Sequence, residues 1–304
     1  MTRSIAAALY LAAIATLPSL GQLGMFSNEQ RTALTSAWTG ERFPDGRPKV
    51  PDSVLDRLKN TTAEEAWGTL RGQGYRLQFE GRWKTINVEP GKRLVGRAVT
   101  AAFLPLRPDL NNYINQNAKK EKRVASGQNS WIIDTLTERD VMVVDLFGKI
   151  EDGTIIGDNL GTSIWTKTKA GLIVDGAVRD VSGISEIKGF QVYARDFHPS
   201  FLADVTLAGI NIPVRIGGVT VLPGDVVLSD PEGIVFIPAH LAERVADESE
   251  LTQLRDKWGH QMLRDGKYTP GQIDTQWTPQ MVEEFNRWAA TQGSKVRIQP
   301  RQRQ

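Results

Sequence analysis

Two nearly continuous apolar runs constrain the fold of this chain most strongly. They are VMVVDLFG at 141–148 and GLIVDG at 171–176, and such runs are typical of strands that are covered on both faces. Between them, GDNLGTSIWTKTKA at 157–170 opens as a glycine loop and continues as a predicted helix. The order strand, loop, helix, strand predicts a parallel crossover. We therefore expect a mixed α/β fold.

Elements of both kinds are predicted on either side of this unit. Thr61 and Glu64 have the spacing of a capping box, which predicts a helix from Thr61 that ends at glycines 72 and 74. Further predicted segments are strands at 94–103 and 190–195, a short helix near 181–188, hairpins at 212–237, a helix from near His240 and an amphipathic helix at about 278–290. The polar stretch 109–129, with KKEKR at 119–123, is predicted as a solvated loop or helix face.

Composition excludes several classes of protein. The chain has 304 residues, 40% of them hydrophobic, which is long and apolar enough for a core without disulfides. It has no cysteine, which excludes a disulfide framework, a thiolate nucleophile and a cysteine zinc site. Three histidines argue against a histidine-rich metal centre. A net charge of +2 predicts no nucleic-acid partner.

The first residues have the pattern of an export signal. Arg3 precedes a short apolar run at 5–17, and small residues follow at Ser19 and Gly21. This pattern predicts a signal peptide at 1–21 and a periplasmic or secreted protein without a stable membrane anchor after cleavage. An uncleaved anchor or a buried helix is the alternative interpretation.

The rest of the chain divides into three predicted parts. Residues 22–60 include ERFPDGRPKVPDS, whose three prolines predict an irregular arm laid over a surface. The main α/β domain follows at 61–245. A helical extension and polar tail are expected at 246–304.

The loop GDNLGTSI at 157–164 is the first candidate for a functional site. Gly157 and Gly161 flank Asp158, Asn159 and Leu160 where the predicted helix begins. Free backbone amides at such a position bind anions, including carboxylates. A turn followed by a helix start has the same pattern, so the loop alone does not decide between the two.

The second candidate is LIVDGAVRD at 172–180, where an apolar strand ends at Arg179 and Asp180. Arginine binds a carboxylate in bidentate fashion, and aspartate is a ligand for a hard divalent cation. A structural ion pair that caps the next helix is the alternative. One loop–helix–strand excursion separates Asp158 from the pair and returns the chain to the same sheet edge. We expect one pocket that suits a small 2-oxo acid bound to a metal, with Asp158 moving the proton.

The spacing of Asp158 from Arg179-Asp180, inside GDNLG and VDGAVRD, resembles the RraA-like family. This family includes the regulator of ribonuclease activity A and the 4-hydroxy-4-methyl-2-oxoglutarate aldolases. The stretch IPVRIGGVTVLPGDVVLSDPEGIVFIP at 212–238 is similar to the closing hairpins of the family. The resemblance covers about 61–245. It implies an αββα sandwich of the swivelling phosphohistidine-domain type, here with N- and C-terminal extensions, and a homotrimer or hexamer with sites between subunits.

The resemblance also implies a role for each site residue. Asp180 would hold Mg²⁺ or Mn²⁺ mostly through water, and Arg179 would bind the carboxylate and ketone of the substrate. The amides of Asn159 and Leu160 would bind the carboxylate, and Gly157 and Gly161 of the same loop would also belong to the substrate-binding site. Asp158 would position the water that protonates a pyruvate enolate. A glutamate of the adjacent subunit would join the metal shell, for which this chain offers Glu243, Glu248 and Glu250.

These observations predict a divalent-metal-dependent lyase, an aldolase or decarboxylase, that acts on a small 2-oxo acid such as 4-hydroxy-4-methyl-2-oxoglutarate or oxaloacetate. The non-catalytic regulators of the family lack the metal aspartate, and the presence of Asp180 favours an enzyme. Two alternatives stay open. One is a non-catalytic oligomeric binding protein, suggested by the arm and tail. The other is a metal-dependent lyase or hydrolase for another exported metabolite, such as an oxidised sugar.

Overall fold

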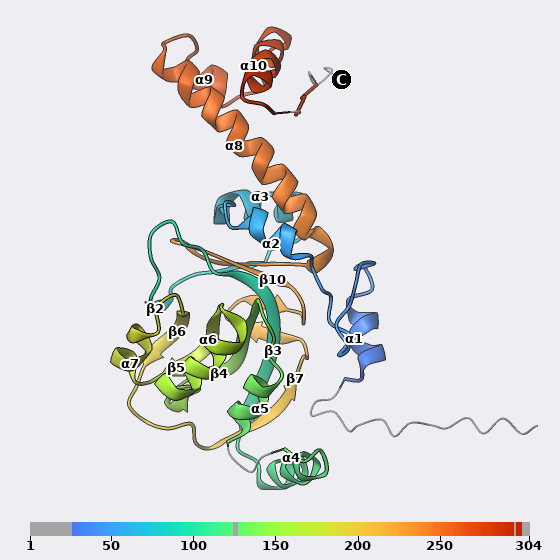
Figure 1. Cartoon of the computed structure of the whole chain (residues 1–304), viewed down its shortest axis with the longest axis vertical. Helices are drawn as coiled ribbons and strands as arrows, with labels where there is room; N and C mark the ends of the chain where they lie inside the picture. The colour runs from blue at the N-terminus through green and yellow to red at the C-terminus, as the bar shows by residue number, and fades with distance from the viewer. Residues whose placement is uncertain (1–25, 124–126, 295, 300–304) are drawn as a thin grey trace, which may run out of the picture.

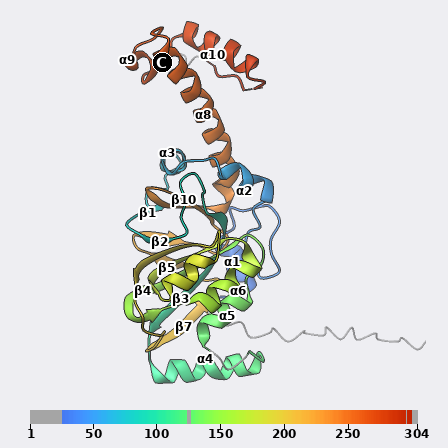
Figure 2. The ribbon, with the colours of Figure 1, turned by 60° about the vertical axis from the view of Figure 1, so that its left-hand side comes forward.

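The computed structural model describes residues 26–123, 127–294 and 296–299. A central sheet with flanking helices forms the body, and the long helix α8 (Ala242–Arg264) leads from it to the last helices (Figure 1). Helix α4 (Pro108–Lys120) lies at the opposite end of the molecule from α9 and α10 (Figure 2). The predicted signal peptide at 1–21 lies outside the described residues.

Within the described residues, the main sheet has nine strands and the order β1-β11-β10-β3-β4-β5-β6-β2, with β7 also paired to β3. Its four central strands are parallel: β3 (Val95–Pro105), β4 (Asp140–Thr154), β5 (Gly171–Val178) and β6 (Gln191–Phe197). The others are β1 (Phe79–Glu80), β2 (Lys84–Ile86), β7 (Val205–Ile210), β10 (Val226–Asp230) and β11 (Gly233–Ile237). The predicted parallel crossover, β4–α6–β5, is confirmed.

Different elements cover the two faces of the central strands. Side chains alternate along a strand, so Met142 and Val144 of β4 face one side and Val141 and Val143 the other. The first side packs against helices α5 (Gln128–Asp134), α6 (Asp158–Thr168) and α7 (Val181–Glu186). The second packs against the hairpin β8–β9 (Val214–Ile216 and Val219–Val221). This double covering explains why every residue of β5 is buried.

The arm at 22–60 is more regular than its prolines predict. It contains α1 (Asn28–Leu34) and α2 (Asp52–Leu58), and neither helix was expected. The prediction was wrong for α2 because Val54, Leu55 and Leu58 bury an apolar face in the core that α8 shares. Between the helices, where the prolines stand, the described backbone forms only the isolated bridge Arg42–Pro48 and turns.

The predicted capping box is displaced by one residue. Helix α3 spans Ala63–Gly72, and Thr62 with Glu65 forms the box in place of Thr61 with Glu64. Thr61 is buried, and Thr62 has the extended backbone of a cap residue. Both pairs fit the motif in sequence, so packing decides which one is used.

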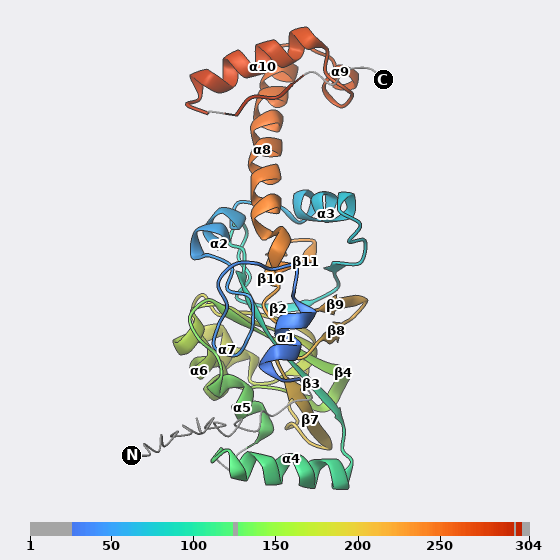
Figure 3. The same cartoon turned by 90° about the vertical axis from the view of Figure 1, so that its right-hand side faces the viewer.

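Helical predictions elsewhere hold. Helix α4 within 109–129 keeps Lys119 and Lys120 exposed, as expected of a solvated helix face. The short helix η1 (Ala239–Leu241) leads into α8, and Figure 3 shows α2 and α3 on either side of the base of α8. Helices α9 (Pro270–Ile273) and α10 (Pro279–Thr291) form a separate small core with the far end of α8. No helix of the described chain combines the length and apolarity that a membrane crossing requires.

Candidate functional site

The candidate site lies where β5 ends and α6 begins. The amide of Ile155 donates to the carbonyl of Ala177 at 2.9 Å, and the amide of Arg179 donates to Ile156 at 3.1 Å. These backbone bonds join the segment before α6 to the end of β5. They place Asp158 on the same sheet edge as Arg179 and Asp180, as the spacing predicts.

Gly157 allows this approach because it has no side chain. A Cβ at Gly157 would stand 2.2 Å from Oδ2 of Asp180, and real Cβ atoms do not come that close. A Cβ at Gly183 of α7 would likewise stand 2.8 Å from the Cβ of Asp158. The two glycines therefore let the carboxylates of Asp180 and Asp158 lie against neighbouring backbone. The sequence reasoning did not identify the role of Gly183.

The amino end of α6 offers fewer free amides than the sequence suggests. Asp158 is the first residue of the helix, and its Oδ1 accepts the amide of Asn159 at 2.8 Å. The amide of Gly161 is committed to the carbonyl of Gly157 at 2.9 Å, so it is not available to a ligand. In the described part of the chain the amide of Leu160 has no acceptor. An anion at this helix end would bind Leu160 and share Asn159 with Asp158.

Gly161 has a packing role in this structure. A Cβ there would stand 3.1 Å from the ring of Phe190, which lies in the core. The geometry therefore gives no support to the expectation that Gly161 contacts the substrate.

Arg179 and Asp180 form a loose, accessible pair. Nε of Arg179 lies 3.6 Å from Oδ2 of Asp180, and the side chains are 35% and 44% exposed. Asp180 has left-handed backbone, with φ of 55°, and precedes α7 without capping it through its side chain. The alternative of a helix-capping ion pair is therefore not what the structure shows, and both side chains can meet a ligand.

Phe201 is a neighbour of Arg179 that the sequence reasoning missed. The guanidinium of Arg179 lies 5.3 Å from the ring centroid of Phe201, and that ring is 70% exposed. The preceding Ser200 is fixed to the end of β4, because its Oγ accepts the amide of Asp152 at 2.7 Å and its carbonyl accepts the hydroxyl of Thr154 at 2.6 Å. No motif marks Phe201, and only the fold places it beside the site.

The donor set of one chain fits a cation that keeps most of its water. Among the described residues, no group of three His, Cys, Asp or Glu side chains is arranged to hold a metal ion. Asp180 offers one exposed carboxylate that makes no cap. Mg²⁺ keeps several waters and takes one or two carboxylates, so a hydrated magnesium or manganese ion fits and an all-protein cage does not.

The three glutamates considered for a second ligand are far from Asp180 within one chain. They belong to α8, which follows β11, and Ile237 at the end of β11 is level with Arg97 at the start of β3. The site lies at the opposite edge, where β5 ends. Glu248 binds Thr69 and Glu250 binds Arg57, so both have partners in this chain.

Comparison with known proteins places this geometry in a family. The sequence model of a protein family described as RraA-like, Aldolase/RraA, matches residues 54–236. This range includes the whole candidate site. The chain belongs to the RraA-like family. A protein of Halalkalibacterium halodurans, provisionally named a 4-hydroxy-4-methyl-2-oxoglutarate aldolase, is 30% identical over 146 residues, which are 47% of this chain and 69% of that protein.

A second RraA-like relative carries the same activity in its name. The 4-hydroxy-4-methyl-2-oxoglutarate aldolase of Thermus thermophilus is 33% identical over 98 residues, 32% of this chain and 58% of the enzyme. Among solved structures, RraAS2 of Streptomyces coelicolor, described as an unusual member of the RNase ES inhibitor RraA family, superposes with a TM-score of 0.58. At 24% identity, with 70% of this chain and 98% of that chain covered, it shows a common fold.

Proposed function

We propose that this protein is a divalent-metal-dependent lyase that cleaves a small 2-oxo acid through a pyruvate-type enolate. The observation that carries the proposal is the meeting of Asp158, Arg179 and Asp180 at the edge where β5 ends, with two glycines that admit no side chain. The names of the two aldolase relatives support this substrate class. 4-Hydroxy-4-methyl-2-oxoglutarate and oxaloacetate are the compounds to test first.

Each residue has a distinct role in this proposal. Arg179 binds the carboxylate and ketone oxygen of the 2-oxo acid through its forked N–H groups. The amide of Leu160, with that of Asn159, binds the same carboxylate at the start of α6. Asp158, beside Asn159, holds the water that returns a proton to the enolate carbon.

Asp180 would hold the cation, Mg²⁺ or Mn²⁺, through water. When bound, the cation supplies positive charge that stabilises the developing enolate oxygen. Arg179 adds a second positive group on the same side, because its guanidinium lies next to the Asp180 carboxylate. Phe201 limits the positions open to that guanidinium.

The finer features of the family belong to the same proposal. We expect the αββα sandwich of the swivelling phosphohistidine-domain type and a homotrimer or hexamer. Among the described residues no group of three ligands meets at the site, which supports sites completed between subunits. Export to the periplasm or beyond follows from the signal-like residues 1–21.

A binding protein without catalysis is the second candidate. It is favoured by one observation: the arm and the α8–α10 extension lie largely outside the family match at 54–236. Pyruvate release from the two 2-oxo acids, with and without a chelator, separates the candidates. Metal-dependent release supports the lyase, and no release from either compound supports the binding protein.

A further inference from the structure

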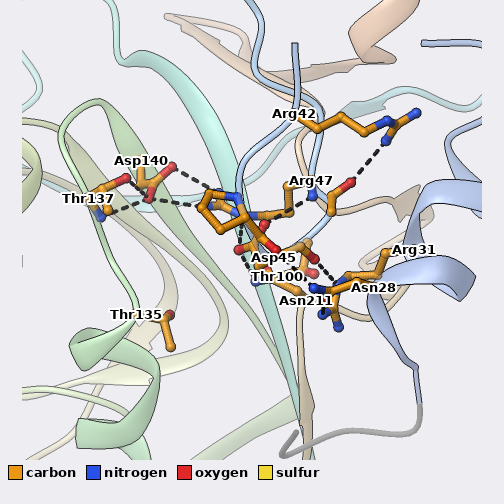
Figure 4. Close-up of polar contacts among 12 residues, drawn as sticks. Asn28, Arg31, Arg42, Asp45, Arg47, Thr100, Thr135, Thr137, Asp140 and Asn211 are labelled. Atoms are coloured by element: carbon orange, nitrogen blue, oxygen red, sulfur yellow. Dashed lines mark hydrogen bonds and ion pairs between the residues drawn. The ribbon is translucent and has the colours of Figure 1, made fainter. Parts of the chain in front are cut away.

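The arm is fixed to the body by a buried ion pair. Arg47 is 2% exposed, and its Nη1 lies 2.9 Å from Oδ1 of Asp140, which is fully buried at the start of β4 (Figure 4). Nε of Arg47 lies 2.8 Å from the carboxylate of Asp45. This carboxylate also accepts a hydrogen bond from Nδ2 of Asn211 at 3.0 Å. Thr137 donates its amide and hydroxyl to Asp140 at 2.8 and 2.9 Å. The arm therefore forms a wall that is attached to the body through this buried polar cluster.

Between this wall and the body lies a cavity of about 810 Å³, which we call the arm cavity. This volume is in the range of small-molecule sites. The arm contributes residues from Ala37 to Val54, the body contributes Arg97, Thr137 and Glu138, and the base of α8 contributes Ala239, His240 and Glu243. Arg97 and Glu138 stand at the amino ends of β3 and β4. The cavity is thus at the opposite sheet edge from Arg179.

Most of the arm cavity lies outside the family match. Of its lining residues, those within the family match at 54–236 are Val54, Arg97, Thr137 and Glu138. The remaining wall comes from the arm before residue 54 and from the segment after 236. The cavity is therefore separate from the candidate site and lies largely outside the matched residues.

The charges in the arm cavity favour a cation. Four carboxylates line it, Glu41, Asp52, Glu138 and Glu243, against the cations Lys49 and Arg97. Lys49 pairs with Glu41 at 2.7 Å, and Arg97 pairs with Asp52. Within the described chain Glu138 and Glu243 form no ion pair at salt-bridge distance, although Glu138 is attracted to the neighbouring Arg139. Partial burial lowers the pKa of His240, which disfavours a positive charge on this side chain.

Aromatic side chains line the same cavity, among them Trp38 and Phe43. Trp38 is held in place by two hydrogen bonds. Its Nε1 donates to the carbonyl of Glu41 at 2.8 Å, and Nη2 of Arg42 donates to the carbonyl of Trp38 at 2.9 Å. Phe43 already has cations over its ring, including Arg47 at 4.6 Å and Lys49 at 5.7 Å. In the described structure the indole of Trp38 has no such cation. Tryptophan is the aromatic side chain best suited to receive one.

We propose that the arm cavity binds a small organic cation, a primary amine attached to an aromatic or apolar group. The ammonium lies between Glu138 and Glu243, and the apolar part lies against Trp38, Val50 and Val54. The apolar wall excludes a bare metal ion as the best occupant, and the unpaired carboxylates exclude an anion. The proposal involves none of the residues at the other sheet edge. It shares one residue with the lyase proposal, Glu243, which is also a candidate metal ligand for a neighbouring subunit.

Calorimetric titration of the purified protein tests this with three probes of one shape: phenethylamine, 2-phenylethanol and 3-phenylpropionate. The expected result is saturable binding of the amine, at least about tenfold tighter than the alcohol, and no binding of the acid. Glu243→Gln and Trp38→Ala each weaken amine binding at least about fivefold. Equal binding of the three probes, or no binding of the amine, overturns the proposal.

Two control variants make the result specific. Glu283→Gln removes an exposed charge on α10, away from the arm cavity, and is expected to leave amine binding unchanged. Asp180→Asn, at the other sheet edge, is expected to bind the amine like the parent protein. Weaker binding in Asp180→Asn would place the amine at the candidate site and overturn the proposal. Circular dichroism and a thermal melt of each variant confirm that it is folded.

Discussion

Gly157 and Asp180 stand so close that the first cannot carry a side chain: a Cβ on Gly157 would lie 2.2 Å from Oδ2 of Asp180. Their contact joins the start of α6 to the end of β5, which are separated in sequence by the whole crossover helix. The backbone of Gly157 has φ of −118°, which any residue can adopt, so glycine is required here for space and not for conformation.

Gly157→Ala is therefore expected to displace the Asp180 carboxylate while the protein still folds. We predict a loss of lyase activity on the order of 10²-fold, as expected when a reacting group moves by about 1 Å. The matched control is Gly68→Ala in α3, where a Cβ would meet nothing within 4 Å. This control should keep full activity and gain up to about 1 kcal/mol of stability. Equal activity of both variants would contradict the role given to Asp180.

Phe201→Ala tests the contact with Arg179. An exposed cation–π contact contributes about 0.5–1 kcal/mol, so kcat/KM for the 2-oxo acid should fall about two- to fivefold. The control is Leu77→Ala, which removes another exposed apolar side chain (73% exposed) and should leave kcat/KM unchanged. The free energy of unfolding should not change in either variant, because both side chains are exposed. Unchanged kinetics in Phe201→Ala would show that the ring does not position Arg179.

The Arg47–Asp140 pair predicts a large effect on stability. Asp140→Ala leaves Arg47 buried without its main partner, and we expect a loss of about 3–5 kcal/mol in the free energy of unfolding. The double variant Arg47→Met/Asp140→Leu should recover much of that loss. Urea unfolding measures both. Glu41→Gln, in the exposed pair with Lys49, is the control and should cost at most about 1 kcal/mol.

Asp225 predicts a pH dependence of stability. Burial raises the pKa of this carboxyl to about 7, while an unfolded aspartate titrates near 3.9. Between these pH values the folded protein keeps a proton that the unfolded chain has lost. The stabilisation that protonated Asp225 gives to the folded state is therefore fully present below about pH 4. It is lost as the pH rises through about 7. Asp225→Asn should make the unfolding free energy flatter between pH 5 and 8. An unchanged slope would contradict the raised pKa.

The sequence predicts the centre of the fold well because patterns there are strong. The apolar runs at 141–148 and 171–176 require strands covered on both faces, and one crossover places Asp158 beside Arg179. Prediction from the sequence fails where tertiary packing decides the local structure. Helix α2 is stabilised by contact with α8, and packing selects Thr62 over Thr61 as the cap. Phe201 is brought to the site by tertiary contacts, which include the hydrogen bonds that join Ser200 to β4.

Pyruvate release tests the lyase proposal most directly. The protein and Asp180→Asn are each given oxaloacetate and 4-hydroxy-4-methyl-2-oxoglutarate with Mg²⁺ or Mn²⁺, and then with a chelator. Above the rate measured without protein, we predict pyruvate release by the parent protein that stops with the chelator and falls at least about 10²-fold in Asp180→Asn. Pyruvate release that survives the chelator, or full activity in Asp180→Asn, would contradict the proposed mechanism.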